Sequence, residues 1–187
     1  QDLLQRSRQQ LDLLSESVDS VLRLAAGEQM VAHRRTDLVQ LVREAVASCT
    51  EEESRDRVAM RNPESIQILA DAVNLRGAIA NVLRSALWHS PKHVPIEVEL
   101  LERAQQAVLT VKDQGPRIPA SDREMIFDAL GRGSSARAQG KGLGLFIARR
   151  VVEAHGGTIS AKSEGLTGVT FQIELPLAQS RRQLSAS

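Results

Sequence analysis

With 187 residues, the chain has the length of one ordinary domain with an additional segment. Its formal net charge of +1 argues against a strongly basic nucleic-acid-binding protein, and its single cysteine, Cys49, excludes an internal disulfide. No apolar run has membrane-spanning length and no signal peptide is evident. We therefore expect a cytoplasmic chain. Because it starts without Met inside a helical pattern, we expect it to be a piece of a longer protein.

The first 27 residues predict a helix with a coiled-coil seam. Leu4, Leu11 and Val18 recur every seven residues, and Gly27 is a suitable residue to end the helix. A narrow apolar stripe of this kind needs a partner helix, which we expect either in a second copy of the chain, giving a homodimer, or in a helical hairpin. Packing of the helix against its own domain is the alternative.

Helical and strand patterns alternate irregularly over the rest of the chain. Ser121 and Glu124 form a capping-box pattern for a short helix that carries Ile126 and Phe127. The short turn before the last strand favours a two-layer α+β sandwich with a mixed sheet over a doubly wound parallel sheet. The other predicted elements are helices at 37–48, 72–89 and 143–155, and strands at 57–60, 65–69, 96–101, 107–112, 158–162 and 169–175.

The segment ALGRGSSARAQGKGLGLFIARR, residues 129–150, is a glycine-rich chain that leads into a predicted helix. This arrangement is common at phosphate sites, because backbone N–H groups and the helix dipole face the anion. A Walker A loop does not fit, since Ser135 stands at its first glycine and Gly142 at its Ser/Thr position. A dinucleotide-binding turn does not fit either, because a polar loop precedes the glycines instead of a strand.

Several blocks, in the same order, resemble the ATP-binding domain of sensor histidine kinases, which has the Bergerat ATPase fold. GKGLGL with the following FIARRVVEAHGGTISAKS is similar to the second glycine box, and VKDQGPRIP at 111–119 to the first. REMIFDALGRGSSARAQ resembles the phenylalanine box and ATP lid, and LRGAIANVLRSALWHSP at 75–91 the asparagine-box helix. The resemblance implies three parts: the second helix of the dimerisation and phosphotransfer hairpin at 1–30, the catalytic domain at 31–178, and a disordered tail at 179–187.

The resemblance also implies a reaction and a set of site residues. Members of the family transfer the γ-phosphoryl group of ATP, which they bind with Mg²⁺, to a histidine and then act on a response regulator. The resemblance implies that this histidine lies outside this chain, on a phosphoacceptor helix of the same homodimeric protein. Asp113 would accept a hydrogen bond from the adenine amino group, and Asn81 with Ser85 would hold Mg²⁺. The nucleotide-binding residues that it implies are Asn81, Ser85, Asp113, Gly115, Arg117, Ile118, Phe127, Arg132, Gly140, Lys141, Gly142, Leu143, Gly144 and Leu145.

The chain departs from the family pattern at the metal end of the expected site. Ser85 replaces the usual second asparagine, Trp88 replaces a common lysine, and Arg117 replaces the last glycine of the first box. A hydroxyl is a weaker Mg²⁺ ligand than a carboxamide oxygen. A degenerate, non-catalytic dimerising module with weak or no nucleotide binding is therefore the alternative function. A serine kinase of the anti-sigma-factor type is a third hypothesis, but it does not account for the helix at 1–27.

Overall fold

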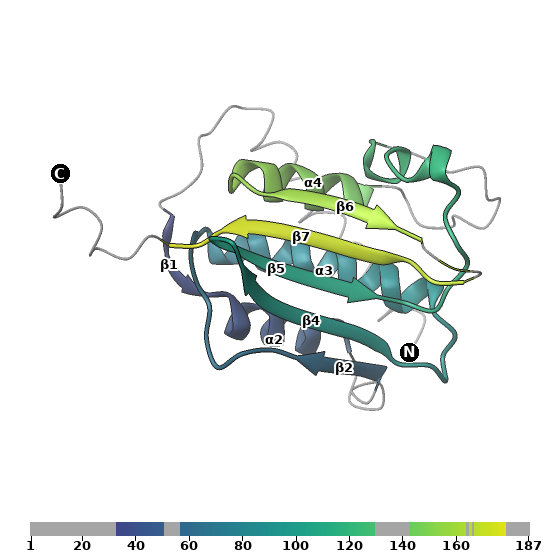
Figure 1. Cartoon of the computed structure of the whole chain (residues 1–187), viewed down its shortest axis with the longest axis horizontal. Helices are drawn as coiled ribbons and strands as arrows, with labels where there is room; N and C mark the ends of the chain where they lie inside the picture. The colour runs from purple at the N-terminus through teal and green to yellow at the C-terminus, as the bar shows by residue number, and fades with distance from the viewer. Residues whose placement is uncertain (1–32, 51–56, 130–142, 164, 166, 179–187) are drawn as a thin grey trace, which may run out of the picture. The chain divides into compact units, whose positions relative to one another are not determined.

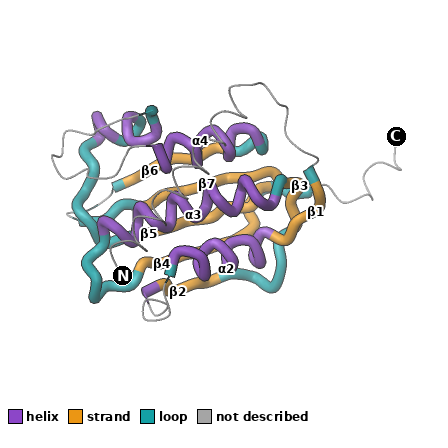
Figure 2. The backbone as a smooth tube through the Cα atoms, turned by 180° about the vertical axis from the view of Figure 1, so that it is seen from behind, coloured by secondary structure: helices purple, strands orange, loops and turns teal. Residues whose placement is uncertain are grey.

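The computed structural model describes residues 33–50, 57–129, 143–163, 165 and 167–178, all within one compact unit. They form a mixed five-stranded sheet with three helices on one of its faces (Figure 1, Figure 2). The predicted two-layer α+β sandwich is thus confirmed. The predicted coiled-coil helix and the predicted tail lie outside the described residues. Within the described ranges, no helix is long and apolar enough to cross a membrane.

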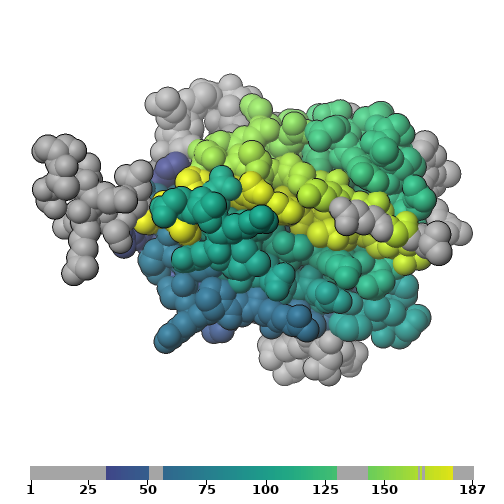
Figure 3. Space-filling model, in the orientation of Figure 1, coloured from purple at the N-terminus to yellow at the C-terminus, as the bar shows by residue number. Residues whose placement is uncertain are grey.

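The five strands run in the order β2–β4–β5–β7–β6. β2 pairs with β4 in parallel, and the other three pairs are antiparallel. No described helix covers the second face of this sheet, which is turned to the viewer in Figure 1 and drawn with its side chains in Figure 3. The strands are β2 (Val58–Arg61), β4 (Ile96–Arg103), β5 (Gln106–Lys112), β6 (Thr158–Lys162) and β7 (Thr170–Pro176).

A second, two-stranded sheet pairs β1 (Arg34–Asp37) with β3 (Gln67–Ala70) in an antiparallel register. β1 was not predicted, because its sequence RRTD has no apolar alternation and becomes a strand by pairing with β3. The two strands predicted on either side of Asn62–Pro63 do exist, but β2 and β3 belong to different sheets and do not form a hairpin.

Three helices lie side by side on the sheet: α2 (Leu38–Cys49), α3 (Ala72–His89) and α4 (Leu143–Ala154), with α3 between the other two (Figure 2). Aspartate side chains start the first two helices. Asp37 accepts a hydrogen bond from the backbone of Val39, and Asp71 accepts from two residues of the first turn of α3. All three helices match their predictions to within one residue at either end.

The core lies between α3 and the helix-facing side of the sheet. It consists mainly of aliphatic side chains, as the low aromatic content predicts. Because α3 is central, the packing of its apolar face on the sheet also sets where its other side chains lie relative to the strands. The fully buried core residues of α3 and the sheet include Leu75, Ile79, Val82, Leu83, Ile96, Val98, Leu109, Val111, Phe171 and Ile173.

The predicted capping box at Ser121 and Glu124 is wrong. Two short 3₁₀ helices, η2 (Ala120–Asp122) and η3 (Met125–Phe127), occupy this segment, and neither has a side-chain cap. The Ser121 hydroxyl donates instead to the carboxylate of Asp122 at 2.9 Å. A capping box needs a continuous first turn of α-helix, which this segment does not form.

His155 connects the end of α4 to the start of α3. Its Nδ1 donates to the carbonyl of Val151 at 2.7 Å, and its Nε2 accepts from the backbone N–H of Asp71 at 3.0 Å. The ring of His33 lies 4.9 Å away, centroid to centroid. Burial lowers the pKa of His155, with a smaller contribution from His33, while the hydrogen bond to Val151 and the charge of Asp71 oppose the change.

We expect His155 to make the fold less stable in mild acid. Its pKa in the unfolded chain is about 6.5, and its pKa in the fold is lower. As the pH falls below about 6.5, the unfolded chain binds a proton that the folded chain does not, so the free energy of unfolding decreases. Urea unfolding at a series of pH values measures this effect. His155→Gln should be less stable at neutral pH but should lose this part of the pH dependence; an unchanged pH dependence in the variant would contradict the assignment.

Candidate functional site

Asp113 is a buried carboxylate at the end of β5, with only 1% of its surface exposed. Its Oδ1 accepts two backbone hydrogen bonds, from Gly115 at 2.7 Å and from Val169 at 3.1 Å. Its Oδ2 receives none from the described residues. Burial raises the pKa of Asp113, while the two backbone hydrogen bonds and the nearby His89 act in the opposite direction. One oxygen is therefore fixed by the fold, and the other can accept a hydrogen bond from a ligand.

Close backbone contacts surround this carboxylate. A Cβ added at Gly115 would lie 2.7 Å from the carbonyl oxygen of His89, the last residue of α3. The N–H of Gly168 donates to the carbonyl of Gly115 at 2.6 Å, and Gly168 has a φ of 88°. The end of α3, the loop after β5 and the residues before β7 therefore meet around Asp113.

Asn81 and Ser85 lie one turn apart on α3, and both are partly buried. The start of α4 lies beside them, because a Cβ added at Gly144 would be 3.6 Å from the Asn81 carboxamide oxygen. From Asn81 to His89, α3 rises by about 12 Å. The structure thus brings Asn81 to the start of α4, at one end of a path along α3 whose other end is Asp113.

Arg84 is a site residue that the sequence analysis missed. Its Nη2 donates to Oδ1 of Asn81 at 2.6 Å, and its Nη1 lies 3.9 Å from the sulfur of Cys49 on α2. The oxygen through which Asn81 would bind Mg²⁺ is therefore already bonded to a cation. With Ser85 as the only other predicted ligand, these residues do not fit a Mg²⁺ ion.

The other predicted residues divide into four groups. Arg117 is exposed and Ile118 partly buried, both in the loop after Asp113. Phe127 is buried, with 1% of its surface exposed, and the guanidinium of Arg149 lies 6.0 Å from the centroid of its ring. Leu143 and Leu145 are partly buried on either side of Gly144. The remaining four lie outside the described residues: Arg132, Gly140, Lys141 and Gly142.

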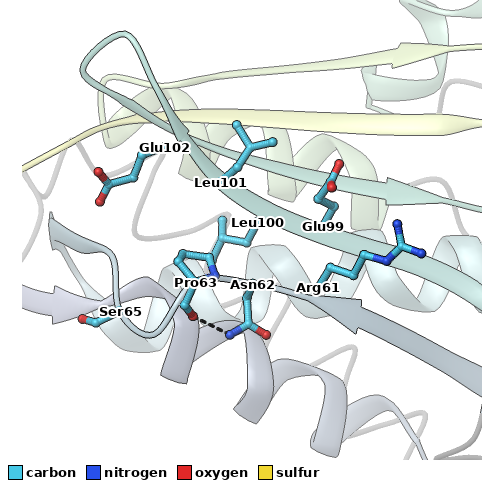
Figure 4. Close-up of a pocket in the computed structure, with 8 residues that line it drawn as sticks. All are labelled: Arg61, Asn62, Pro63, Ser65, Glu99, Leu100, Leu101 and Glu102. Carbon is cyan, nitrogen blue, oxygen red and sulfur yellow. Dashed lines mark hydrogen bonds between the residues drawn. The ribbon is translucent and has the colours of Figure 1, made fainter.

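A separate hollow of about 520 Å³ lies between the end of β2 and β4 (Figure 4). Arg61, Asn62 and Pro63 line it on one side, and 99–102 on the other. In the sheet, the start of β4 pairs with the Lys112 end of β5, so this hollow lies toward the opposite end of β4 from Asp113. It contains no predicted site residue and is not part of the site.

The described residues thus form a two-layer sandwich with a buried carboxylate at a strand end, tight glycine contacts and a helix start beside an asparagine. Residues 70–179 match the family of histidine kinase-, DNA gyrase B- and HSP90-like ATPases, and the chain belongs to this family. Its relatives and structural neighbours are sensor histidine kinases, so it is an ATP-binding catalytic domain of that type.

Two relatives cover almost the whole chain. The sensor protein IrlS of Burkholderia pseudomallei is 33% identical over an alignment of 183 residues, and the alignment covers 94% of this chain and 39% of IrlS. The adaptive-response sensory kinase SasA of Synechococcus is 31% identical over an alignment of 188 residues, and the alignment covers 97% of this chain and 49% of SasA. The chain thus spans less than half the length of these relatives.

Solved structures agree with the fold. The mycobacterial sensor histidine kinase MprB has a TM-score of 0.68 at 27% identity, covering 79% of this chain and 99% of that one. A full-length ShkA structure in complex with AMPPNP has a TM-score of 0.75 at 23% identity, covering 96% of this chain and 39% of that one. The family predicted from the sequence is confirmed, and nothing in these comparisons favours the degenerate alternative.

Proposed function

We propose that this domain binds ATP with the adenine amino group hydrogen-bonded to Asp113. The observation that carries the proposal is the Asp113 carboxylate, buried, with Oδ1 fixed by two backbone N–H groups and Oδ2 without a donor among the described residues. A buried acceptor selects a ligand that donates at that place, because a ligand that cannot donate leaves it unpaired. Adenine donates there through its amino group, whereas guanine carries an oxygen.

The triphosphate then extends along α3 toward Asn81 and the start of α4. Helix starts favour phosphate, because their first N–H groups have no partner within the helix. The predicted contacts of Gly140, Lys141 and Gly142 with the phosphates stay part of this proposal. The role of the domain is to hold the γ-phosphoryl group in position and to neutralise its charge, the main contributions to catalysis of phosphoryl transfer.

The acceptor in this proposal is a histidine outside the chain, on the phosphoacceptor helix of a homodimeric parent protein. The bond between the γ-phosphorus and its bridging oxygen breaks, a phosphorus–nitrogen bond forms with the imidazole, and ADP leaves. A response regulator then receives the phosphoryl group in the cytoplasm. The names of the relatives, which are sensor kinases, support this assignment.

Transfer of label from γ-³²P-ATP tests this function. The chain is mixed with a phosphoacceptor helix that contains a histidine, and with the same helix carrying glutamine in its place. We expect label that is stable in base and labile in acid, as phosphohistidine is, on the histidine form alone. Label on both forms, or label that survives acid, would contradict a histidine kinase activity and would favour a hydroxyl acceptor.

A further inference from the structure

Arg84 places a permanent positive charge at the phosphate end of the site. It lies on α3 between the two residues predicted to bind the metal, Asn81 and Ser85, and it is partly buried. The 2.6 Å bond from its Nη2 to the Asn81 oxygen is a short, charge-assisted hydrogen bond. Its Nη1 also contacts the Cys49 sulfur at 3.9 Å, so the guanidinium is held from both α2 and α3.

This arrangement is unfavourable for a metal ion. A Mg²⁺ ion binds oxygen ligands at about 2.1 Å, so an ion on the Asn81 oxygen would lie within about 5 Å of the Arg84 nitrogen, where two cations repel each other. The other polar groups there are the Asn81 amide N–H₂, which donates hydrogen bonds and does not bind metal ions, and the Ser85 hydroxyl. Within the described part of the chain, no group of three or more His, Cys, Asp or Glu residues could hold a metal.

The same groups are well suited to an anion. A guanidinium has five N–H donors, and the described contacts engage one on Nη1 and one on Nη2. Three donors remain, and the planar guanidinium matches the oxygens of a phosphate. With its oxygen bonded to Arg84, the Asn81 carboxamide presents N–H groups to other partners. The Ser85 hydroxyl can donate as well. Arg84, Asn81 and Ser85 thus offer one charge and several donors on a single helix face.

We propose that Arg84 binds the phosphates of ATP directly and replaces Mg²⁺ at this end of the site, so that ATP binding does not depend on the metal. This inference rests on the proposed function, because it assumes that the triphosphate lies along α3. It identifies Arg84 as the residue that supplies the charge, and it gives a reason why an asparagine is not needed at position 85.

Calorimetric titration of the whole chain with ATP tests this inference, once in excess Mg²⁺ and once in EDTA. We expect the two affinities to agree within about twofold. Arg84→Gln should weaken binding by roughly 10- to 100-fold in both buffers, since it removes a charge-assisted hydrogen bond to phosphate. Arg76→Gln is the matched control: Arg76 lies on the same helix, is exposed, and pairs with Glu44 at 3.5 Å, so its loss should leave the affinity unchanged.

A double variant tests whether the charge of Arg84 is what disfavours Mg²⁺ at this site. In Arg84→Gln with Ser85→Asn, the repelling charge is gone and a second carboxamide is present, so Mg²⁺ should now tighten ATP binding by roughly tenfold or more. Tightening of that size in the unmodified chain, or unchanged affinity in Arg84→Gln, would overturn the role of Arg84 while leaving Asp113-dependent ATP binding intact. A chain that does not bind ATP in either buffer would overturn the proposed function and this inference together.

Discussion

Asp113→Asn should weaken ATP binding by at least about 100-fold and leave the fold intact. The asparagine oxygen can still accept the two backbone hydrogen bonds from Gly115 and Val169, so the local backbone does not need to move. Its amide nitrogen, however, replaces the oxygen that would accept from adenine, and two donors then face each other. The loss of a charged acceptor together with an unpaired buried donor accounts for about 3 kcal/mol or more.

Calorimetry with ATP measures this loss, and circular dichroism with urea unfolding checks the fold. Glu102→Gln is a suitable control, because it removes a carboxylate that is exposed on β4, far from Asp113 along the strand. The control should bind ATP as the unmodified chain does. If Asp113→Asn also binds ATP at normal affinity, Asp113 does not recognise adenine.

Gly168→Ala should lower the free energy of unfolding by roughly 2–4 kcal/mol and also weaken ATP binding. Gly168 has a φ of 88°, which is unfavourable for alanine, and an added Cβ would lie 2.6 Å from the backbone oxygen of Asp113. The backbone would have to shift next to Val169, whose N–H holds the Asp113 carboxylate. Urea unfolding gives the stability, and calorimetry under folding conditions gives the affinity.

Gly77→Ala is the matched control for this substitution. Gly77 is exposed within α3, and an added Cβ would meet nothing within 4 Å. Alanine there should raise the free energy of unfolding by about 0.5–1 kcal/mol, because glycine is unfavourable inside a helix. If alanine changed the free energy of unfolding equally and in the same direction at positions 77 and 168, neither the positive φ of Gly168 nor its closeness to the Asp113 carbonyl would affect stability.

The helices and most strands could be predicted because their signals are local. The apolar face of α3 repeats with helical period over 72–89, and the observed helix has these same bounds. β1 could not be predicted, since its residues become a strand only through pairing with β3, about thirty residues later. The capping box was wrong for a related reason: the side-chain pattern was present, but the chain there turns twice as 3₁₀ helix.

The candidate site could likewise be predicted where its signals are local, and not where they depend on residues far away in the sequence. Asp113 and Gly115 could be proposed from their motif, but the N–H of Val169, which fixes the Asp113 carboxylate, comes from 56 residues further along the chain. No local pattern marks Val169 as a partner. Arg84 had a weak local signal, because it lies three residues after Asn81 and hence on a neighbouring part of the same helix face. Side-chain geometry was needed to show that it bonds to the Asn81 oxygen.

Titration of the unmodified chain with ATP and with GTP tests the central claim most directly. The claim is that the carboxylate of Asp113, buried and held by backbone N–H groups, selects adenine. We predict saturable binding of one ATP per chain, competition by ADP, and GTP binding that is weaker by at least about 100-fold. Absence of ATP binding, or equal affinity for ATP and GTP, would contradict the claim.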